Sequence, residues 1–152
     1  MFVTQPSALL ALFPWLLALT SLNVQADSQR FGDYTVHYTV FNSTFVQPEI
    51  AQAHNLVRAR DRALVNISVT RTIDGATTLG QPARVQGAAT NLMQQRQPLD
   101  FMEISESDAT YYIASLRHTN EETYNLTVRV QPSDSTQQPF ELKFTRKLYV
   151  EK

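Results

Sequence analysis

Cysteine is absent from the 152 residues, and glycine is scarce, with four copies. Without cysteine the chain forms no disulfide, thiolate zinc site, iron–sulfur cluster or catalytic thiol, and it offers no thiol for lipid attachment. The glycines are scattered, so the sequence contains no glycine-rich loop that cradles a phosphate. Positive charge is not in excess either, since 13 Lys and Arg stand against 14 Asp and Glu. The net charge of −1 argues against a dedicated nucleic-acid-binding protein.

The first 26 residues contain no charged side chain. Residues 8–19 are apolar throughout, Pro14 being the one interruption, and this stretch is too short for a bilayer that needs about 20 apolar residues. Val24-Gln25-Ala26 places small or aliphatic residues at the positions that a signal peptidase requires. The pattern predicts a signal peptide over residues 1–26, cleaved between Ala26 and Asp27, and a single domain over 27–152. The alternative is an uncleaved anchor, because the segment before the apolar stretch lacks Lys and Arg.

An exported chain normally has access to disulfides, yet this one has none. Three N-x-S/T motifs occur, at Asn42, Asn66 and Asn125, and the last two fall within predicted strands, which speaks against glycan attachment. A cysteine-free exported domain suits a bacterial periplasm. We therefore predict a periplasmic protein with no membrane span after signal removal.

Most of the remaining chain alternates between apolar and polar residues, which is typical of strands with one buried face. The predicted strands cover residues 34–40, 63–70, 83–93, 99–104, 112–116, 124–130 and 140–150. Asp74-Gly75 predicts a tight turn after the second of them. The parity of the apolar residues switches between Leu99 and Met102, which favours a β-bulge.

One segment has helical spacing instead. Pro48 suits the first position of a helix, and Ile50, Ala53, His54 and Val57 follow at helical intervals. At about nine residues such a helix is stable only when packed on the sheets.

About seven strands with one short connecting helix predict an all-β fold, an antiparallel β-sandwich. Asp108 lies four residues before Tyr112, which is the spacing of the tyrosine corner in immunoglobulin-like domains. We therefore predict the immunoglobulin-like variant of the sandwich. A polar turn followed by an aromatic strand is the alternative interpretation of the same residues.

Several stretches of the chain together resemble a known family. They are His37-Tyr38, FNSTF at 41–45, ALVNISV at 63–69, Asn91-Leu92 and YYI at 111–113. The resemblance is to the bacterial exported family called domain of unknown function 4426, found in proteobacteria of the Pseudomonas and Vibrio type, and it covers about residues 28–151. It implies a small exported β-rich domain of a Gram-negative bacterium. It implies no reaction and supplies no catalytic residues.

The potential metal ligands are dispersed. His37, His54 and His118 show none of the spacings of a metal pair on a helix or strand. Together with Met93 and Met102 they form no tight His/Met cluster, although a His/Met copper carrier is one alternative function. Surface histidines and core methionines are the simpler interpretation, and we expect no metal site and no cofactor.

Carboxylates occur close together at Glu103, Glu106 and Asp108 and again at Glu121-Glu122. They make a small periplasmic hydrolase a second alternative, since a pair about 5–10 Å apart can perform acid/base catalysis. Solvated loop charges are the simpler interpretation, and no G-x-S-x-G motif indicates a serine nucleophile. We therefore expect no catalytic residues.

The most pointed polar feature is the series Arg58, Arg60 and Arg62. In an extended segment, alternation would place their guanidinium groups on one face, with Asp61 pointing away. Such a face could bind a carboxylate, a phosphate or an acidic partner. The alternative is loose pairing with the acidic segment 103–108.

Phe41 and Phe45 flank three small polar residues. Aromatic residues in this arrangement either line a shallow recognition site or, as we favour, anchor a strand crossing in the core. Taken together, the sequence predicts a non-enzymatic binding or interaction module. Its loops or a free sheet edge would contact a protein or another envelope component.

Overall fold

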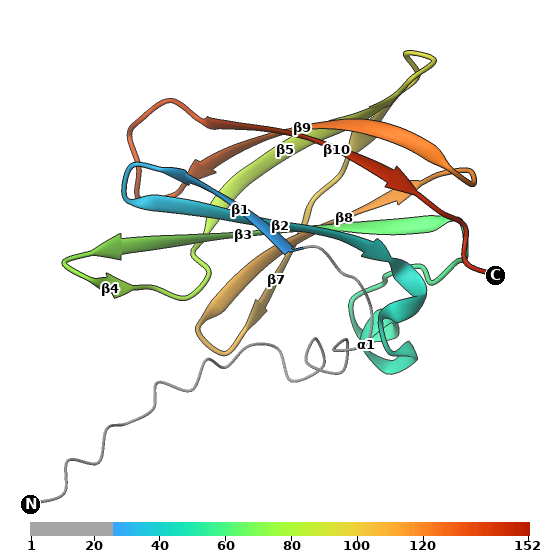
Figure 1. The fold of residues 1–152 in the computed structure, drawn as a ribbon. Helices are drawn as coiled ribbons and strands as arrows, with labels where there is room; N and C mark the ends of the chain where they lie inside the picture. Colours follow the sequence, from blue (N-terminus) through green and yellow to red (C-terminus); the bar gives the residue numbers. More distant parts are fainter. Residues whose placement is uncertain (1–25) are drawn as a thin grey trace, which may run out of the picture.

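The computed structural model describes residues 26–152. The predicted signal peptide lies outside the described residues except for Ala26, so its cleavage before Asp27 stays a prediction. Within the described part, two antiparallel sheets face each other (Figure 1).

The first sheet has the order β1 (Ala26–Phe31), β2 (Tyr34–Asn42), β3 (Arg62–Ile73), β8 (Ala109–Arg117) and β7 (Met102–Glu106), and β4 (Ala76–Thr77) pairs with the end of β3. The second sheet has the order β10 (Phe140–Leu148), β9 (Glu122–Pro132), β5 (Ala83–Asn91) and β6 (Arg96–Leu99). The all-β sandwich predicted from the alternating pattern is therefore confirmed.

The predicted local features are confirmed in part. A 3₁₀ turn, Ser43–Phe45, leads into α1 (Pro48–Ala53), which begins at the expected proline but is shorter than predicted. The turn at Asp74-Gly75 forms with positive φ at both residues, 52° and 80°. Positive φ at both central residues matches the right-handed twist of a hairpin, and Asp-Gly tolerates it.

The predicted bulge between Leu99 and Met102 is wrong. Leu99 ends β6 in the second sheet, and Met102 begins β7 in the first sheet. The apolar parity switches because the chain crosses from one sheet to the other: Leu99 packs between the two sheets, whereas Ile104 of β7 packs on the outer face of its sheet.

The predicted tyrosine corner is also wrong. The Tyr112 hydroxyl accepts a hydrogen bond of 2.7 Å from the backbone N–H of Ala83 and donates one of 3.4 Å to Glu103. Ala83 begins β5, so this tyrosine connects the two sheets and does not bond to nearby backbone upstream of itself. The immunoglobulin-like variant of the sandwich stays a prediction.

The core lies between the sheets, where strands from both layers contribute fully buried side chains. Its largest members below 2% exposure include Val36, Val65, Ile67, Leu116, Leu126, Val128 and Leu142. Each such side chain contributes about 1.5–3 kcal/mol through burial. A second cluster joins α1 and the turn before it to the outer face of the first sheet; it contains Phe41, Val46, Ala51, Leu64, Ile104 and Ile113. This packing stabilises a helix too short to form alone.

One side of the sandwich is closed by aromatic contacts between β1 and β2 of the first sheet and β10 of the second. Phe31 stacks on Phe140 with ring centroids 4.7 Å apart, and Tyr38 contacts Phe144 at 4.5 Å. Asp27, the first residue after the predicted cleavage site, forms an ion pair with Arg146 of β10.

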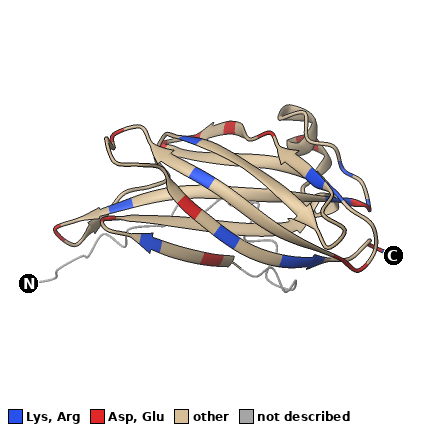
Figure 2. Cartoon of the chain, turned by 90° about the horizontal axis from the view of Figure 1, so that it is seen from above, with Lys and Arg blue, Asp and Glu red and all other residues tan. Residues whose placement is uncertain are grey.

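The exposed face of β10 carries Glu141, Lys143 and Lys147, and Figure 2 shows Lys, Arg, Asp and Glu distributed along the strands. Charges on an edge strand disfavour pairing with a further strand. The loops are therefore better candidates for a binding surface than this sheet edge.

Candidate functional site

Strands of both sheets begin or end together at the right-hand end of the molecule in Figure 1, which we call the C-terminal end. The strand registers establish this, because they align Asn42 with Ala63, Arg62 with Arg117, Asn91 with Tyr124, and Glu122 with Leu148. The connecting segments 42–61, 91–96 and 117–122 and the final residues 147–152 therefore lie at one end of the sandwich.

The predicted arginine series lies at this end, but not in the predicted way. Arg58 and Arg60 precede β3 in a segment that is not a strand, so alternation does not place them on one face with Arg62. Arg58 donates a hydrogen bond of 3.0 Å to the backbone oxygen of Thr44, and Arg60 donates one of 2.7 Å to that of Glu151. The segment thereby joins the turn before α1 to the end of the chain.

These contacts leave positive charge at the C-terminal end. Arg58 and Arg60 bind neutral carbonyl oxygens rather than the acidic segment 103–108, so their charges are not compensated by these bonds. Arg117 does pair with Asp61 at 3.3 Å, with side chains 73% and 41% exposed. Exposed pairs of this kind contribute about 0–1 kcal/mol. Binding of a ligand or partner by Arg58 and Arg60 stays a prediction.

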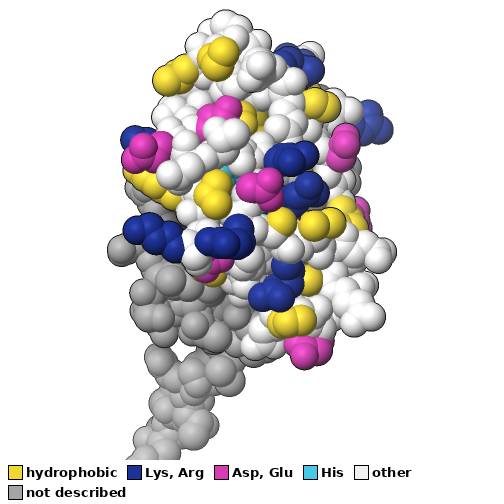
Figure 3. All heavy atoms as spheres, turned by 90° about the vertical axis from the view of Figure 1, so that its right-hand side faces the viewer, with side chains coloured by type: hydrophobic (Ala, Val, Ile, Leu, Met, Phe, Trp, Pro, Cys, Tyr) yellow, Lys and Arg dark blue, Asp and Glu magenta, His cyan; other side chains and the backbone are white. Residues whose placement is uncertain are grey.

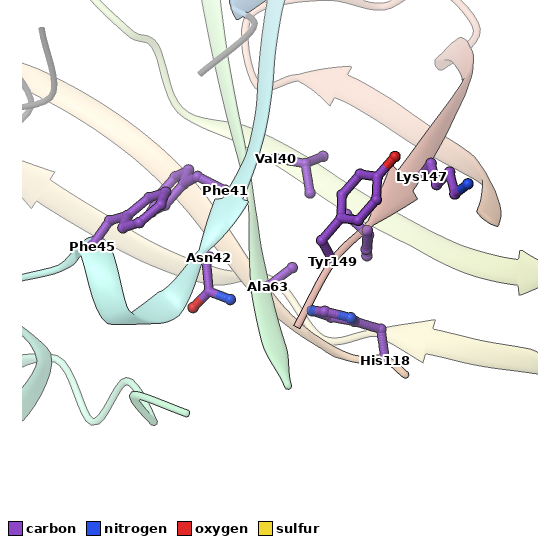
Figure 4. A pocket seen from close by; sticks show the side chains of 9 residues that line it. Val40, Phe41, Asn42, Phe45, Ala63, His118, Lys147 and Tyr149 are labelled. Carbon is purple, nitrogen blue, oxygen red and sulfur yellow. The ribbon is translucent and has the colours of Figure 1, made fainter. Parts of the chain in front are cut away.

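A shallow cavity of about 200 Å³ opens at the same end (Figure 4). Its lining includes Val40, Phe41, Asn42, Phe45, Ala63, His118, Lys147, Leu148 and Tyr149. His118 is 4% exposed, and its Nδ1 lies 2.9 Å from the backbone oxygen of Thr119. Phe41 and Phe45 pack in the second core cluster and also line the cavity, so their anchoring role in the core is confirmed and their role in a recognition site stays a prediction.

Large apolar side chains are exposed at the C-terminal end. They are Val57 (52% exposed), Leu92 (69%), Met93 (78%) and Tyr149 (58%). The opposite end exposes Ile73 and Leu79 beside the β3–β4 hairpin, at 47% and 46%. Clustering of exposed apolar residues is typical of interaction sites, whereas single exposed ones are ordinary.

The Glu121-Glu122 pair is divided between two environments. Glu121 is exposed, whereas Glu122 accepts hydrogen bonds from the Thr119 backbone N–H at 2.8 Å and from Asn91 Nδ2 at 2.8 Å. Partial burial alone would raise the pKa of this carboxyl group, but the bonds from Thr119 and Asn91 stabilise its charged form and lower the pKa from 4.5 to about 2. Burial, together with the Glu122 carboxylate, raises the pKa of Tyr124 to about 12.

A carboxylate with this low pKa holds no proton at neutral pH and has its oxygens occupied, so it is poorly suited to general acid or base catalysis. Glu103, from the other acidic segment, accepts a hydrogen bond from Tyr112 at 3.4 Å. The hydrogen bonds of Glu122 and Glu103 thus connect parts of the fold to one another.

The histidines and methionines are dispersed over the described part of the chain. His37 lies in β2 with its Nε2 2.9 Å from Thr70 Oγ1, and His118 lies at the C-terminal end. Met93 is in the turn between β5 and β6, and Met102 is in β7 of the other sheet. Among residues 26–152, no group of three or more His, Cys, Asp or Glu could hold a metal ion.

A polar cavity of about 280 Å³ at the opposite end is lined by side chains that bond to one another. Asp134 accepts a hydrogen bond of 2.9 Å from Tyr34 and forms an ion pair with Arg71 at 3.1 Å. Arg71 also lies over the Tyr34 ring, at 5.1 Å from its centroid. These contacts fasten the 132–135 loop to β2 and β3.

Sequence reasoning missed several residues of the C-terminal end, notably Leu92, Lys147 and Tyr149. Leu92-Met93 did carry a signal, because two consecutive large apolar residues continue past the end of an alternating strand. Lys147 and Tyr149 carried none, since they continue the pattern of the last strand.

The fold and the site define a small all-β sandwich domain with a loop-built surface at one end. No helix in the described part of the chain is both long and apolar enough to cross a membrane. The chain belongs to the family described as Domain of unknown function (DUF4426), whose model matches residues 28–151. The resemblance inferred from the sequence is thereby confirmed.

A DUF4426 family protein from Pseudomonas aeruginosa PAO1 has a similar crystal structure, with 31% identity and a TM-score of 0.72 over 84% of this chain and 97% of that one. Copper-bound FetP from uropathogenic Escherichia coli is similar at 13% identity and a TM-score of 0.61, over 84% and 96% of the chains. Copper-bound P19 from Campylobacter jejuni reaches 11% identity and 0.56, over 82% and 96%. The last two likenesses show the fold alone. No match was found among curated proteins.

Proposed function

We propose that this protein is a non-enzymatic binding module of the bacterial periplasm that engages an envelope component or protein through its C-terminal end. One observation carries the proposal: exposed apolar side chains and uncompensated guanidinium groups gather there on loops held by both sheets. A rigid sandwich that presents such loops is a common basis for recognition.

Three observations support the periplasm as the location. The first 26 residues have the pattern of a signal peptide, and the cysteine-free domain folds on its core without covalent links. The related fold of FetP comes from a protein that was expressed in the periplasm of E. coli.

Replacing Arg58 and Arg60 together by alanine should reduce binding to isolated envelope fragments or to a partner in periplasmic extract at least tenfold. The expected loss follows because charged contacts to an acidic partner disappear. The measurement is co-sedimentation with envelope fragments, together with crosslinking in the extract.

The matched control is the double change Arg30→Ala and Arg84→Ala, which removes two exposed arginines outside the C-terminal end. Arg30 also donates to a backbone oxygen, that of Gly32, at 2.9 Å. The control should bind like the unmodified protein, and both variants should unfold within about 2 °C of it, because exposed substitutions have small effects on stability. Equal binding by both variants, or no binding by the unmodified protein, would contradict the proposal.

Copper titration distinguishes the module from a copper carrier. Because the histidines and methionines are spread over both sheets, we expect no stoichiometric binding of copper, measured by metal analysis of the dialysed protein. A one-to-one complex that His37→Ala or His118→Ala abolishes would favour the copper carrier instead.

A further inference from the structure

The His118 imidazole is buried, yet one of its two nitrogens has no bonding partner. The residue is 4% exposed and directly follows β8, where its backbone N–H donates to the Asp61 oxygen at 2.9 Å. Nδ1 lies 2.9 Å from the backbone oxygen of Thr119, whereas Nε2 has no hydrogen-bond partner among residues 26–152. Figure 3 views the C-terminal end directly and shows almost no histidine surface, in agreement with this burial. An unpaired polar atom in such a position costs free energy that a bound ligand recovers.

The unpaired nitrogen is reached through the cavity at the C-terminal end. Nε2 of His118 is not one of the fully enclosed unpaired atoms of the described residues, so a partner can approach it. His118 lines the cavity of about 200 Å³, and Figure 4 shows its imidazole pointing toward Ala63 and Tyr149. A ligand that enters this cavity therefore meets Nε2.

The bond to Thr119 determines what Nε2 offers to a ligand. A carbonyl oxygen only accepts hydrogen bonds, so Nδ1 carries a proton. In the neutral ring Nε2 is then an acceptor. A ligand group with a hydrogen on oxygen or nitrogen bonds to this acceptor, whereas a carboxylate presents only further lone pairs.

The other polar side chains of the lining do not compete for this acceptor. Asn42 is fully engaged, because its Oδ1 accepts from the Thr44 N–H at 3.0 Å and its Nδ2 donates to the Arg60 oxygen at 3.1 Å. Figure 4 shows the Lys147 ammonium group and the Tyr149 hydroxyl pointing away from His118. The cavity therefore matches a ligand with one hydrogen-bond donor at its inner end.

The remaining lining of the cavity is apolar and largely aromatic. It consists of Val40, Phe41, Phe45, Ala63, Leu148 and the ring of Tyr149. A cavity of about 150 Å³ holds one benzene ring. The volume of about 200 Å³ found here therefore accommodates a single ring with its substituent. Aromatic walls favour an aromatic ligand through edge and face contacts. The complementary group is a phenol.

We propose that this cavity receives the phenol ring of a tyrosine from a partner protein, with the tyrosine hydroxyl donating a hydrogen bond to His118 Nε2. The inference rests on the proposed function and specifies the anchoring side chain of its partner. Small-molecule sites typically measure roughly 300–1,000 Å³. A shallow cavity for one ring retains that ring firmly only when the rest of the partner contacts the surrounding surface. Tyrosine is among the residues that most often anchor protein interfaces in this way.

Binding of p-cresol, which is the tyrosine side chain as a free molecule, tests the recognition directly. In protein labelled with ¹⁵N-histidine, p-cresol should shift the Nε2 resonance of His118, which is assigned by its loss in His118→Gln. The resonances of His37 and His54 should not move. Toluene has the same shape without the hydroxyl and should bind at least about tenfold more weakly, because Nε2 then stays unpaired. Tighter binding of p-toluate or of methylindole than of p-cresol would overturn the assignment of a phenol.

Two substitutions locate the binding site. Tyr149→Ala removes an aromatic wall at an exposed position and should weaken p-cresol binding at least about fivefold. Leu79→Ala is the matched control at the opposite end and should bind p-cresol like the unmodified protein. His118→Phe keeps a ring in place without the acceptor, so p-cresol and toluene should then bind within about twofold of each other. An unchanged preference for p-cresol in this variant contradicts the inference. If His118→Phe does not fold, Tyr149→Ala and the preference of the unmodified protein decide.

Photocrosslinking identifies the source of the ring. With p-benzoylphenylalanine in place of Lys147 at the rim of the cavity, irradiation in periplasmic extract should capture a peptide that contains tyrosine, as determined by mass spectrometry. In a synthetic copy of this peptide, replacing the tyrosine by phenylalanine should weaken binding at least about tenfold. Captured peptides without tyrosine, or equal binding of the two synthetic peptides, would overturn the inference.

The outcomes separate the two proposals. A partner whose binding depends on Arg58 and Arg60, without any binding of p-cresol, overturns the tyrosine inference and leaves the binding module in place. Binding of p-cresol without capture of a tyrosine peptide indicates a site for free phenols and overturns the partner protein as the source. Failure to bind p-cresol, envelope fragments and extract alike overturns both proposals.

Discussion

Gly80→Ala should lower the free energy of unfolding by about 3 kcal/mol, a loss typical of overpacking against backbone. Gly80 is buried where β3 and β8 diverge, and its backbone oxygen accepts a 2.9 Å hydrogen bond from the N–H of Thr110. A methyl group on Gly80 would lie 2.4 Å from the Thr110 backbone oxygen and 3.0 Å from Ser68 Oγ. The contact involves backbone, so it can be relieved only by separating the 78–82 segment from β8.

Gly75→Ala is the comparison for this loss. Gly75 has φ of +80° with nothing within 4 Å of an added methyl group, so alanine there costs conformational strain alone, about 1 kcal/mol. Urea unfolding of both variants, followed by circular dichroism, measures the difference. Equal losses at the two glycines would show that close packing at Gly80 is not what stabilises this connection.

Gly80 also illustrates which parts of the fold can be predicted from the sequence. The strands can be predicted because each has one buried face. In β2, β3 and β9 this face produces a direct alternation of apolar and polar residues. The crossing from Leu99 to Met102 was misassigned because a bulge and a change of sheet produce the same parity switch. Gly80 and Pro82 indicate a loop, but the wedging of that loop between two strands depends on contacts that are distant in sequence.

Less of the candidate site could be predicted from the sequence. Arg58 and Arg60 were identified as a possible binding feature, but the assumed alternation was incorrect, because hydrogen bonds to Thr44 and Glu151 hold them in an irregular segment. The convergence of this segment with Leu92 and Tyr149 follows from strand registers, which a single sequence does not contain. Composition therefore indicated the kind of surface, and the pairing of strands determined its location.

The half-buried carboxylate of Glu122 joins the β5–β6 hairpin to the β8–β9 loop. Its Oε2 accepts from the Thr119 backbone N–H and hydroxyl, at 2.8 and 3.0 Å, and its Oε1 accepts from Asn91 at 2.8 Å. The neighbouring Glu121 lies in the turn before β9, with a φ of 57°, and is exposed. The sequence shows two equivalent acids, and the structure assigns the stabilising role to one of them.

Glu122→Gln should lower the free energy of unfolding by about 2 kcal/mol at pH 7, because an amide group replaces one acceptor oxygen with a donor that faces other donors. Glu121→Gln is the matched control and should change it by less than about 0.5 kcal/mol. Urea denaturation at pH 7 measures both. Equal effects of the two changes would contradict the assignment of Glu122 as the connecting group.

The pH dependence gives the same assignment a second test. Because folding lowers the pKa of Glu122 from 4.5 to about 2, the unfolded chain binds more protons in this range. The stabilisation is therefore fully present above about pH 5 and is lost as the pH falls toward 2. The pKa difference corresponds to at most about 3 kcal/mol, which partial exposure reduces to about 2. Between pH 5 and pH 2.5, Glu122→Gln should lose correspondingly less stability than the unmodified protein, whereas Glu121→Gln should follow the unmodified curve. Parallel curves for all three proteins would show that other carboxylates govern acid unfolding.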